Sequence, residues 1–359
     1  AYEISLGLVG SEMCIRDRLI LLTFLMRMES VRINLFSDTQ TQPSPGMRQA
    51  MAEAEVGDEQ HLLDPSINRL CEEVALRLGK DKAMFLPSGT MCNQIALAVH
   101  CAAGDEIIAD RTAHIVNSEA AGSAVFVGAA IRTLNGERGI FQPADVEASL
   151  RTGRALEPRS RLVVVEQTSN GGGGSIWPLE TLVGVAEVAR SHGLGVHMDG
   201  ARLLNAVVAS GIPAIDFADP VDSVWLDLSK GLGCPVGAVL AGSNGFIREA
   251  WRWKHRLGGA MRQAGILAAA GSWALAHHVD RLAEDHENAR SFAQRIGSII
   301  AVTILNSRVE TNLVFFDVAG TGWSSKEVEA RLRERLQGER PALFQRHGGR
   351  SRQGIQHGA

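Results

Sequence analysis

The chain has 359 residues, of which 45% are hydrophobic, 21% charged and 5% aromatic. These proportions exclude a collagen, a coiled coil and a wholly disordered protein. Thirty-six basic residues against 40 acidic ones give a net charge of −4, and no basic stripe interleaved with aromatic residues occurs. Nucleic acid is therefore not expected as a partner. A chain longer than about 250–300 residues usually divides its core between two domains.

The N-terminal segment lacks the pattern of a folded domain. Residues 1–18 (AYEISLGLVGSEMCIRDR) resemble a translated sequencing adapter. The apolar run after it, 19–26, is shorter than the ~20 residues needed to span a bilayer and lacks an A-x-A cleavage site. We expect residues 1–27 to be a non-native or disordered leader, with the native start near Met28 and no membrane as a partner.

The cysteines indicate a reducing compartment. There are five, an odd number, and none forms a C-x-x-C pair. A disulfide framework or a zinc site is therefore not expected, no metal is predicted, and the cytoplasm is the predicted location.

Between about Ile33 and Ile300, strands and helices alternate. Helical spacing of apolar residues predicts helices over 65–79, 91–100, 179–192 and 280–300. Short apolar runs bounded by Gly, Asp, Asn or Ser predict buried strands at 83–86, 106–109, 162–165, 195–198, 223–228 and 238–241. This alternation predicts an α/β fold, with a mainly parallel sheet and helices on both of its faces.

The C-terminal part has a different pattern. A strand-like run at 311–318 and a helix at 325–337 predict the start of a smaller α+β domain. We therefore predict a large domain over 28–275, an incomplete small domain over 276–344, and a disordered tail over 345–359. The tail, QRHGGRSRQGIQHGA, has no strand periodicity and is rich in Gly, Arg and Gln. It is either a frameshifted remnant or a natural solvated tail.

Ligands of open α/β sheets bind outside the carboxyl ends of the strands, and polar residues come after several predicted strands here. Lys230 is in the Ser-Lys-Gly-Leu-Gly turn after 223–228, and Asp199 comes directly after 195–198. Burial at a strand end would lower the pKa of such a lysine, the condition for Schiff-base chemistry. Asp199 could hold a proton on a pyridine nitrogen, as a pyridoxal phosphate electron sink requires.

Two further groups complete this pattern. Ser88-Gly89-Thr90 opens a helix and offers N–H groups, hydroxyls and a favourable dipole to a phosphate. Arg202 can bind a carboxylate by two hydrogen bonds. Each feature also has an ordinary interpretation: a snorkelling lysine, a helix cap, an N-cap aspartate and an ion-pair arginine. Their conjunction at the strand ends favours an aldehyde cofactor site.

The motifs also resemble those of a known family, the threonine aldolases of the pyridoxal-phosphate (PLP) fold type I, or aspartate aminotransferase, superfamily. The resemblance runs from about Asn34 to Ile300. It is carried by SDTQTQPSPGMRQAM, AEVGDEQ with DPSINRL, FLPSGTMCNQ, TAHI, HMDGARLLNA, DSVWLDLSKGLGCPVGAVLAG and GGAMRQAG. It implies a seven-stranded sheet, PLP as cofactor and a site at a dimer interface, in a homodimer or homotetramer.

The resemblance also implies residue roles. Lys230 would form the Schiff base, Asp199 would pair with the pyridinium nitrogen, and Ser88-Gly89-Thr90 would cradle the phosphate. His114 would stack on the ring or help with proton transfer. Ser37 and Arg202 would contact the substrate carboxylate or cofactor oxygens. Arg262 would reach the cofactor region at a subunit interface.

Some residues depart from the family pattern. The chain has Phe36 and Gln42 where arginine is usual, QHLL at 60–63 where Val-Tyr-Gly-Glu is common, Glu-Gln-Thr-Ser at 166–169 where Glu-Asn-Thr-His is frequent, and His255 at a usual lysine position. These departures concern the preference for the substrate side chain. The R-x-V-T-H-like strand that ends the family's small domain is also missing, which would reduce the carboxylate clamp to Arg202 and Ser37.

The predicted reaction is the cleavage of a β-hydroxy-α-amino acid to glycine and an aldehyde by retro-aldol chemistry. Small molecules are the expected partners. The base that takes the β-hydroxyl proton is either His114 or a bound water. Two alternatives are another fold type I reaction, such as β-elimination or transamination, and a catalytically impaired, cofactor-binding chain.

Overall fold

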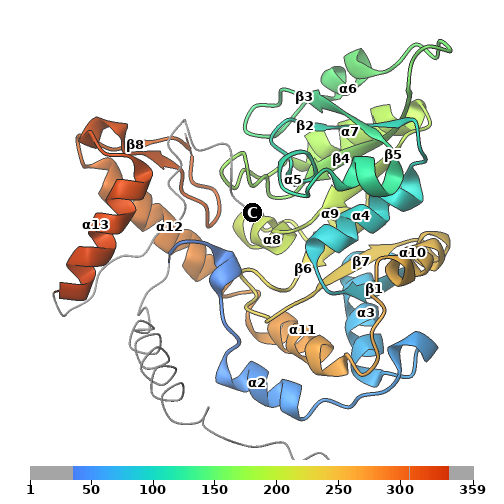
Figure 1. Ribbon diagram of the computed structural model, residues 1–359, viewed down its shortest axis with the longest axis horizontal. Helices are drawn as coiled ribbons and strands as arrows, with labels where there is room; N and C mark the ends of the chain where they lie inside the picture. The colour runs from blue at the N-terminus through green and yellow to red at the C-terminus, as the bar shows by residue number, and fades with distance from the viewer. Residues whose placement is uncertain (1–34, 307, 339–359) are drawn as a thin grey trace, which may run out of the picture.

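The fold is built around one seven-stranded sheet. The computed structural model describes residues 35–306 and 308–338. The strand order is β1-β7-β6-β5-β4-β2-β3, and only β7 runs antiparallel to its neighbours β1 and β6. The predicted α/β fold with a mainly parallel sheet is therefore confirmed (Figure 1).

Six of the seven strands coincide with the predicted apolar runs. The strands are β1 (Lys82–Leu86), β2 (Asp105–Asp110), β3 (Ala130–Leu134), β4 (Arg159–Glu166), β5 (Gly195–Asp199), β6 (Ser223–Asp227) and β7 (Ala238–Gly242). The sequence analysis missed β3. This edge strand, AIRTL, has no fully buried residue, so it lacks the continuous apolar run that marks a strand buried on both faces.

Helices cover both faces of the sheet. On one face, Met84, Leu86 and Leu240 pack with α4 (Gly89–His100) and α10 (Asn244–Arg256). On the other face, Phe85, Val239 and Ala241 share a core with α2 (Pro45–Ala52), α3 (Pro65–Arg77), α7 (Leu179–Ser191), α8 (Leu203–Ser210), α9 (Ala214–Ala218) and α11 (Gly265–His277). Alternate residues of one strand thus enter different cores, as the two-residue period of a strand requires.

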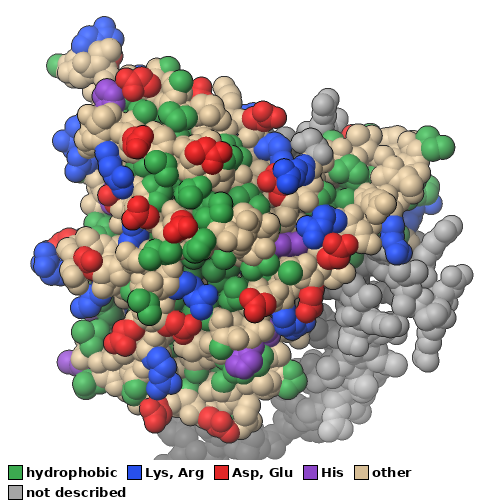
Figure 2. All heavy atoms as spheres, turned by 180° about the vertical axis from the view of Figure 1, so that it is seen from behind, with side chains coloured by type: hydrophobic (Ala, Val, Ile, Leu, Met, Phe, Trp, Pro, Cys, Tyr) green, Lys and Arg blue, Asp and Glu red, His purple; other side chains and the backbone are tan. Residues whose placement is uncertain are grey.

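Shorter elements lie around these layers. They are η1 (Asp38–Gln40), η2 (Glu59–His61), α5 (His114–Asn117), the π-helical turn η3 (Ser123–Val127) and α6 (Pro143–Ser149). Among the described residues, no helix combines the length and the apolar character that crossing a bilayer would require. On the face seen in Figure 2, acidic and basic side chains are interspersed.

The C-terminal region lies beside the sheet in Figure 1. It contains α12 (Leu282–Gly297), a two-stranded sheet of β8 (Thr303–Ile304) and β9 (Phe316–Asp317), η4 (Ala319–Thr321) and α13 (Ser325–Gly338). The helices predicted at 280–300 and 325–337 are present.

The strand predicted over 311–318 is wrong in extent, because only its last part forms β9. Thr311 and Asn312 instead donate hydrogen bonds to Gly174 O and to Asp38. These side-chain bonds tie the start of the segment to residues near the large sheet. The domain boundary at residue 275 stays a prediction. The leader over 1–27 and the tail over 345–359 lie outside the described residues.

Candidate active site

The predicted site residues gather at the carboxyl edge of the sheet. Strands β4, β5 and β6 are parallel neighbours, so their carboxyl ends meet at one edge. Glu166 and Asp199 are register partners at the ends of β4 and β5. Lys230 comes three residues after Asp227, the last residue of β6. The sheet thus brings together residues that are 64 positions apart between Glu166 and Lys230.

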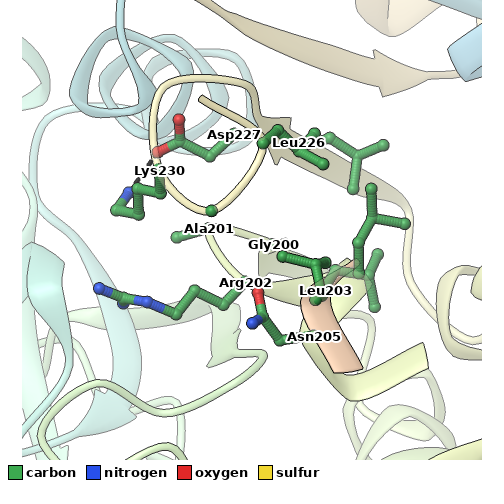
Figure 3. Close-up of a pocket in the computed structure, with 12 residues that line it drawn as sticks. Gly200, Ala201, Arg202, Leu203, Asn205, Leu226, Asp227 and Lys230 are labelled. Carbon is green, nitrogen blue, oxygen red and sulfur yellow. Dashed lines mark hydrogen bonds and ion pairs between the residues drawn. The ribbon is translucent and has the colours of Figure 1, made fainter. Parts of the chain in front are cut away.

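Lys230 is partly buried and paired. Its Nζ forms an ion pair with Asp227 and lies 5.6 Å from the centroid of the Trp225 ring. The backbone carbonyl of Lys230 accepts a hydrogen bond from Thr41 Oγ1 at 2.6 Å. In Figure 3, Lys230 and Arg202 extend from their loops toward the same side, with Ala201 between them. Both belong to the lining of one pocket, which also includes Asp227 and Asn205.

Asp199 is a buried carboxylate with two hydrogen-bond donors. Its Oδ2 accepts from Asn93 Nδ2 at 2.8 Å, and its Oδ1 accepts from the Ala201 N–H at 3.0 Å. Burial raises the pKa of Asp199, although His114 and Asn93 oppose this rise by favouring the charged form.

The turn after β1 forms the start of α4. Ser88 is its N-cap, and its hydroxyl accepts from the Met91 N–H at 3.2 Å. A Cβ at Gly89 would lie 2.1 Å from the Trp225 ring, so only glycine lets the turn pass over this indole. Ser88 and Thr90 are exposed. This turn therefore leads into the N-terminus of a helix of 12 residues, and an anion is favoured at such an end.

His114 begins α5, directly after the loop that leaves β2. Its backbone N–H donates to Glu166 Oε2 at 2.7 Å, and its Nδ1 is hydrogen-bonded to Glu119 Oε1 at 2.7 Å. Burial lowers the pKa of His114. The hydrogen bond to Glu119 and the charges of Asp199 and Glu119 outweigh that effect, and the net direction is upward.

Arg202 is buried and engaged by a carboxylate. Its Nε and Nη2 donate to the two oxygens of Asp38 at 2.6 and 2.8 Å, and its Nη1 donates to Asn170 Oδ1 at 3.3 Å. Burial opposes ionisation of Asp38, but Arg202 holds the pKa of this carboxyl well below its usual range. Ser37 caps η1 directly before Asp38. Ser37 and Arg202 are thus brought close through Asp38.

Glu166 links His114 with Asn170. Its Oε1 accepts from the Asn170 N–H at 2.6 Å, opposite the bond to His114. Burial, reinforced by the charge of Asp199, raises the pKa of Glu166 to about 7. Protonation of this buried carboxyl near neutral pH would alter the support of both neighbours.

Arg262 lies elsewhere, on an exposed segment where its Nη1 pairs with Asp58 at 3.2 Å. Next to it, Lys254 and Glu59 form a fully buried ion pair, and Glu59 Oε2 accepts from the Met261 N–H. Lys254, one position before the usual lysine of the family, therefore has a structural role, and His255 takes no part in that ion pair.

The sequence analysis missed several polar partners: Asp38, Asn93, Glu119, Asn170 and Asp227. Asn93 could have been found, because it lies four residues after Gly89 and on the same helix face. Glu119 has no such signal. Ligand atoms of His114, Glu119 and Asp199 lie within 4.8 Å of one another. Asn93 Nδ2 donates to both carboxylates, and His114 Nδ1 is hydrogen-bonded to Glu119. These carboxylate oxygens therefore already have the partners that a metal ion would otherwise provide.

The fold and the site define the class of protein: a fold type I lyase whose lysine lies at the carboxyl edge of the sheet. The sequence model of a family described as beta-eliminating lyase matches residues 34–321.

Curated relatives include low-specificity L-threonine aldolase 1 of Arabidopsis thaliana, 39% identical over 84% of this chain and 86% of the relative. The low specificity L-threonine aldolase of Escherichia coli K12 is 40% identical over 80% of this chain and 84% of the relative. The chain belongs to the threonine aldolase family, and this family is PLP-dependent.

Solved structures agree. The chain superposes on a Listeria monocytogenes protein, assigned provisionally as an L-allo-threonine aldolase, with a TM-score of 0.64 and 26% identity. This match covers 77% of this chain and 79% of the other. Threonine aldolase of Leishmania major gives a TM-score of 0.66 at 20% identity, over 77% and 82% of the two chains. At that identity the match supports the fold alone.

Proposed function

We propose that this protein cleaves β-hydroxy-α-amino acids of the threonine, allo-threonine or phenylserine type to glycine and an aldehyde, using PLP. The observation that carries this proposal is the placement of Lys230 and Asp199 at one sheet edge, in a chain about 40% identical to low-specificity L-threonine aldolases. The relatives' names supply the substrate class, and the site supplies the groups.

The residues present fit PLP. The Ser88-Gly89-Thr90 turn offers exposed hydroxyls and a helix N-terminus to the phosphate, and Gly89 keeps the backbone against Trp225. Asp199 is a buried acceptor suited to a pyridinium N–H. Lys230 supplies the amine that would hold the aldehyde. When bound, PLP draws electrons away from the substrate α-carbon, which makes the Cα–Cβ bond breakable.

The protein's own residues orient and move protons. Arg202, fixed by Asp38, would offer its remaining N–H groups to a substrate carboxylate, and Ser37 directly precedes Asp38 in the chain. Orientation of this kind can lower a barrier by several kcal/mol, because the reacting groups are already ordered. Among the described residues, the ring of His114 has a hydrogen-bond partner at Nδ1 and none at Nε2. Its Nε2 is therefore suited to take the proton of the β-hydroxyl.

We further propose a homodimer or homotetramer in the cytoplasm, with Arg262 of one subunit near the site of another. Arg262 pairs with Asp58, and the nearby Leu62 and Leu63 are exposed. These exposed apolar side chains support an interface around Arg262. The four described cysteines are free, in keeping with a reducing compartment.

The test is a product assay with the full chain loaded with PLP. Threonine, allo-threonine and phenylserine are supplied separately, and glycine and the aldehyde are quantified. Equal amounts of both products support the proposal. Ammonia with a keto acid would show β-elimination instead, a keto acid without free ammonia would show transamination, and absence of turnover by a folded, cofactor-loaded protein would show an impaired chain.

Two variants control this assay. Lys230→Ala should lose turnover by roughly a thousandfold or more, whereas Lys82→Ala, on the exposed start of β1, should not. Borohydride reduction of the loaded protein should attach the cofactor to the peptide containing Lys230. Label on another lysine would refute its role.

A further inference from the structure

Glu119 contacts the ring of His114 but was not predicted as a site residue. Its Oε1 lies 2.7 Å from His114 Nδ1, and the carboxylate side chain is fully buried. The His114 side chain keeps 35% of its surface exposed. The histidine is therefore hydrogen-bonded at Nδ1, and about a third of its side chain remains accessible.

The proton on this contact can be placed by the neighbours. Trp225 Nε1 can only donate, and it lies 2.7 Å from Asn93 Oδ1. This fixes the orientation of the Asn93 amide, so its Nδ2 donates to Glu119 Oε1 at 2.7 Å and to Asp199 Oδ2. Gln94 Nε2 donates to the other oxygen of Glu119. A carboxylate surrounded by donors accepts, so His114 carries its proton on Nδ1.

The backbone after Glu119 is also unusual. Ala120 and Ala121 both have positive φ, at 50° and 58°. This left-handed conformation costs about 1–2 kcal/mol for a residue with a side chain. Gly122 then approaches Gln94 so closely that a Cβ there would lie 2.5 Å from its amide carbon. The chain sustains this conformation in the turn that carries Glu119 under His114.

We propose that Glu119 is a positioning residue for the reaction: it fixes the proton of His114 on Nδ1, orients the ring, and leaves Nε2 to accept the β-hydroxyl proton. Asn93 holds Glu119 in place. When Nε2 takes the proton, the O–H bond breaks, the imidazole becomes an imidazolium, and the adjacent carboxylate stabilises the new charge. The catalytic part of this inference rests on the proposed function.

The first test uses the cofactor-free protein and needs no turnover. Histidine labelled with ¹⁵N reports which ring nitrogen carries the proton, and His114→Asn identifies the resonance among the 11 histidines. We expect the Nδ1–H form in the wild type at high pH. An Nε2–H form would overturn the proposal whether or not the protein is an aldolase.

The second test is the variant Glu119→Gln. The charges facing His114 are Glu119, Asp199 and Glu166, so removing one of them should lower the His114 pKa and move the acidic limb of the kcat–pH profile to lower pH. We expect kcat to fall roughly tenfold or more, with a smaller change in KM. An unchanged His114 titration would contradict the proposal.

Controls separate positioning from stability. Glu106 is also a buried glutamate. It lies at the start of β2, the end of that strand opposite to His114, and it pairs with Arg151, so Glu106→Gln should leave the His114 titration unchanged. Glu119→Asp keeps the charge and should restore part of kcat and the position of the acidic limb. If Glu119→Gln does not fold, the wild-type tautomer and Glu119→Asp still decide the question. Failure of the retro-aldol assay would refute the proposed function but not the tautomer.

Discussion

The seven-stranded sheet and the C-terminal region are held together in different ways. The strands of the sheet contribute to three large apolar clusters, with residues such as Phe85 and Val196 fully buried. In the C-terminal region, the separate buried cluster of the described residues consists of Ala289, Ala293 and Val314. Its strands β8 and β9 have two residues each. The sheet can therefore hold functional groups rigidly, whereas the C-terminal region has little apolar support of its own.

Polar contacts tie the C-terminal region to the site. Asn312 donates to Asp38, Thr311 donates to Gly174 O, and Asn306 donates to Gly173 O. Arg138 and Glu310 add an ion pair. Such bonds are directional but each contributes only about 1 kcal/mol net. The sheet thus carries the proposed reacting groups, and the C-terminal region contacts the loops around them through a few polar bonds.

The largest expected effect concerns chemistry at the sheet edge. Asp199→Asn should keep the fold but lower kcat by about a hundredfold or more, because a neutral amide does not hold a proton on the pyridine nitrogen and a charge-assisted hydrogen bond is about twice as strong as a neutral one. Steady-state kinetics with circular dichroism checks this. Asp105 is a buried aspartate at the start of β2 that pairs with Arg159 of β4, and Asp105→Asn is the matched control. Near wild-type turnover by Asp199→Asn would refute the role of Asp199.

The next prediction compares the apolar core of the sheet with the small apolar cluster of the C-terminal region. Leu182→Ala in α7, fully buried on the sheet, should lower the global free energy of unfolding by about 2–5 kcal/mol. Val314→Ala should remove only ~1–2 kcal/mol and should act locally. Urea unfolding and hydrogen exchange distinguish these outcomes: faster exchange confined to 282–338 is expected for Val314→Ala. A uniform loss of protection would show that the two regions unfold as one unit.

Two histidines, His197 in β5 and His100 at the end of α4, should make the fold sensitive to acid. Burial lowers the pKa of His100 to about 4 and that of His197 to about 3. Below about pH 6.5 these two histidines bind protons in the unfolded chain but not in the native state, so their contribution to stability falls as the pH drops from about 6.5 toward 4. Each histidine would contribute about 1.4 kcal/mol per pH unit in that window.

Urea titrations at several pH values test this. His100→Gln should flatten the slope of stability against pH by about one histidine's share. An unchanged slope in His100→Gln would show that other groups cause the acid sensitivity.

The smallest expected effect probes the link between the regions. Asn312→Ala removes one donor to Asp38, which holds Arg202, and should raise KM a few-fold with little change in kcat, since about 1 kcal/mol is involved. Asn244→Ala, at the exposed start of α10, is a neutral control. A large fall in kcat would mean that the C-terminal region contributes to the chemistry itself.

Local sequence pattern was enough to predict the sheet and the groups at its edge. Buried strands such as β4 and β6 are nearly continuous apolar runs, and parallel topology places the residues after each strand at one edge. Lys230, Asp199 and the Gly89 turn could therefore be predicted from the residues alone, and the family motifs added His114 and Ser37. The edge strand β3 was missed because its residues are only partly buried.

The polar groups that support these residues depend on tertiary packing. Asp38 is 164 positions from Arg202, and Asn93 is 106 from Asp199, so no spacing rule connects them. The same reason explains why the strand predicted over 311–318 was wrong in extent. The side chains of Thr311 and Asn312 bond to residues that are far away in the sequence. Local apolar periodicity is encoded over a few residues, whereas hydrogen-bond partners in a buried network are chosen by how the strands and helices are packed.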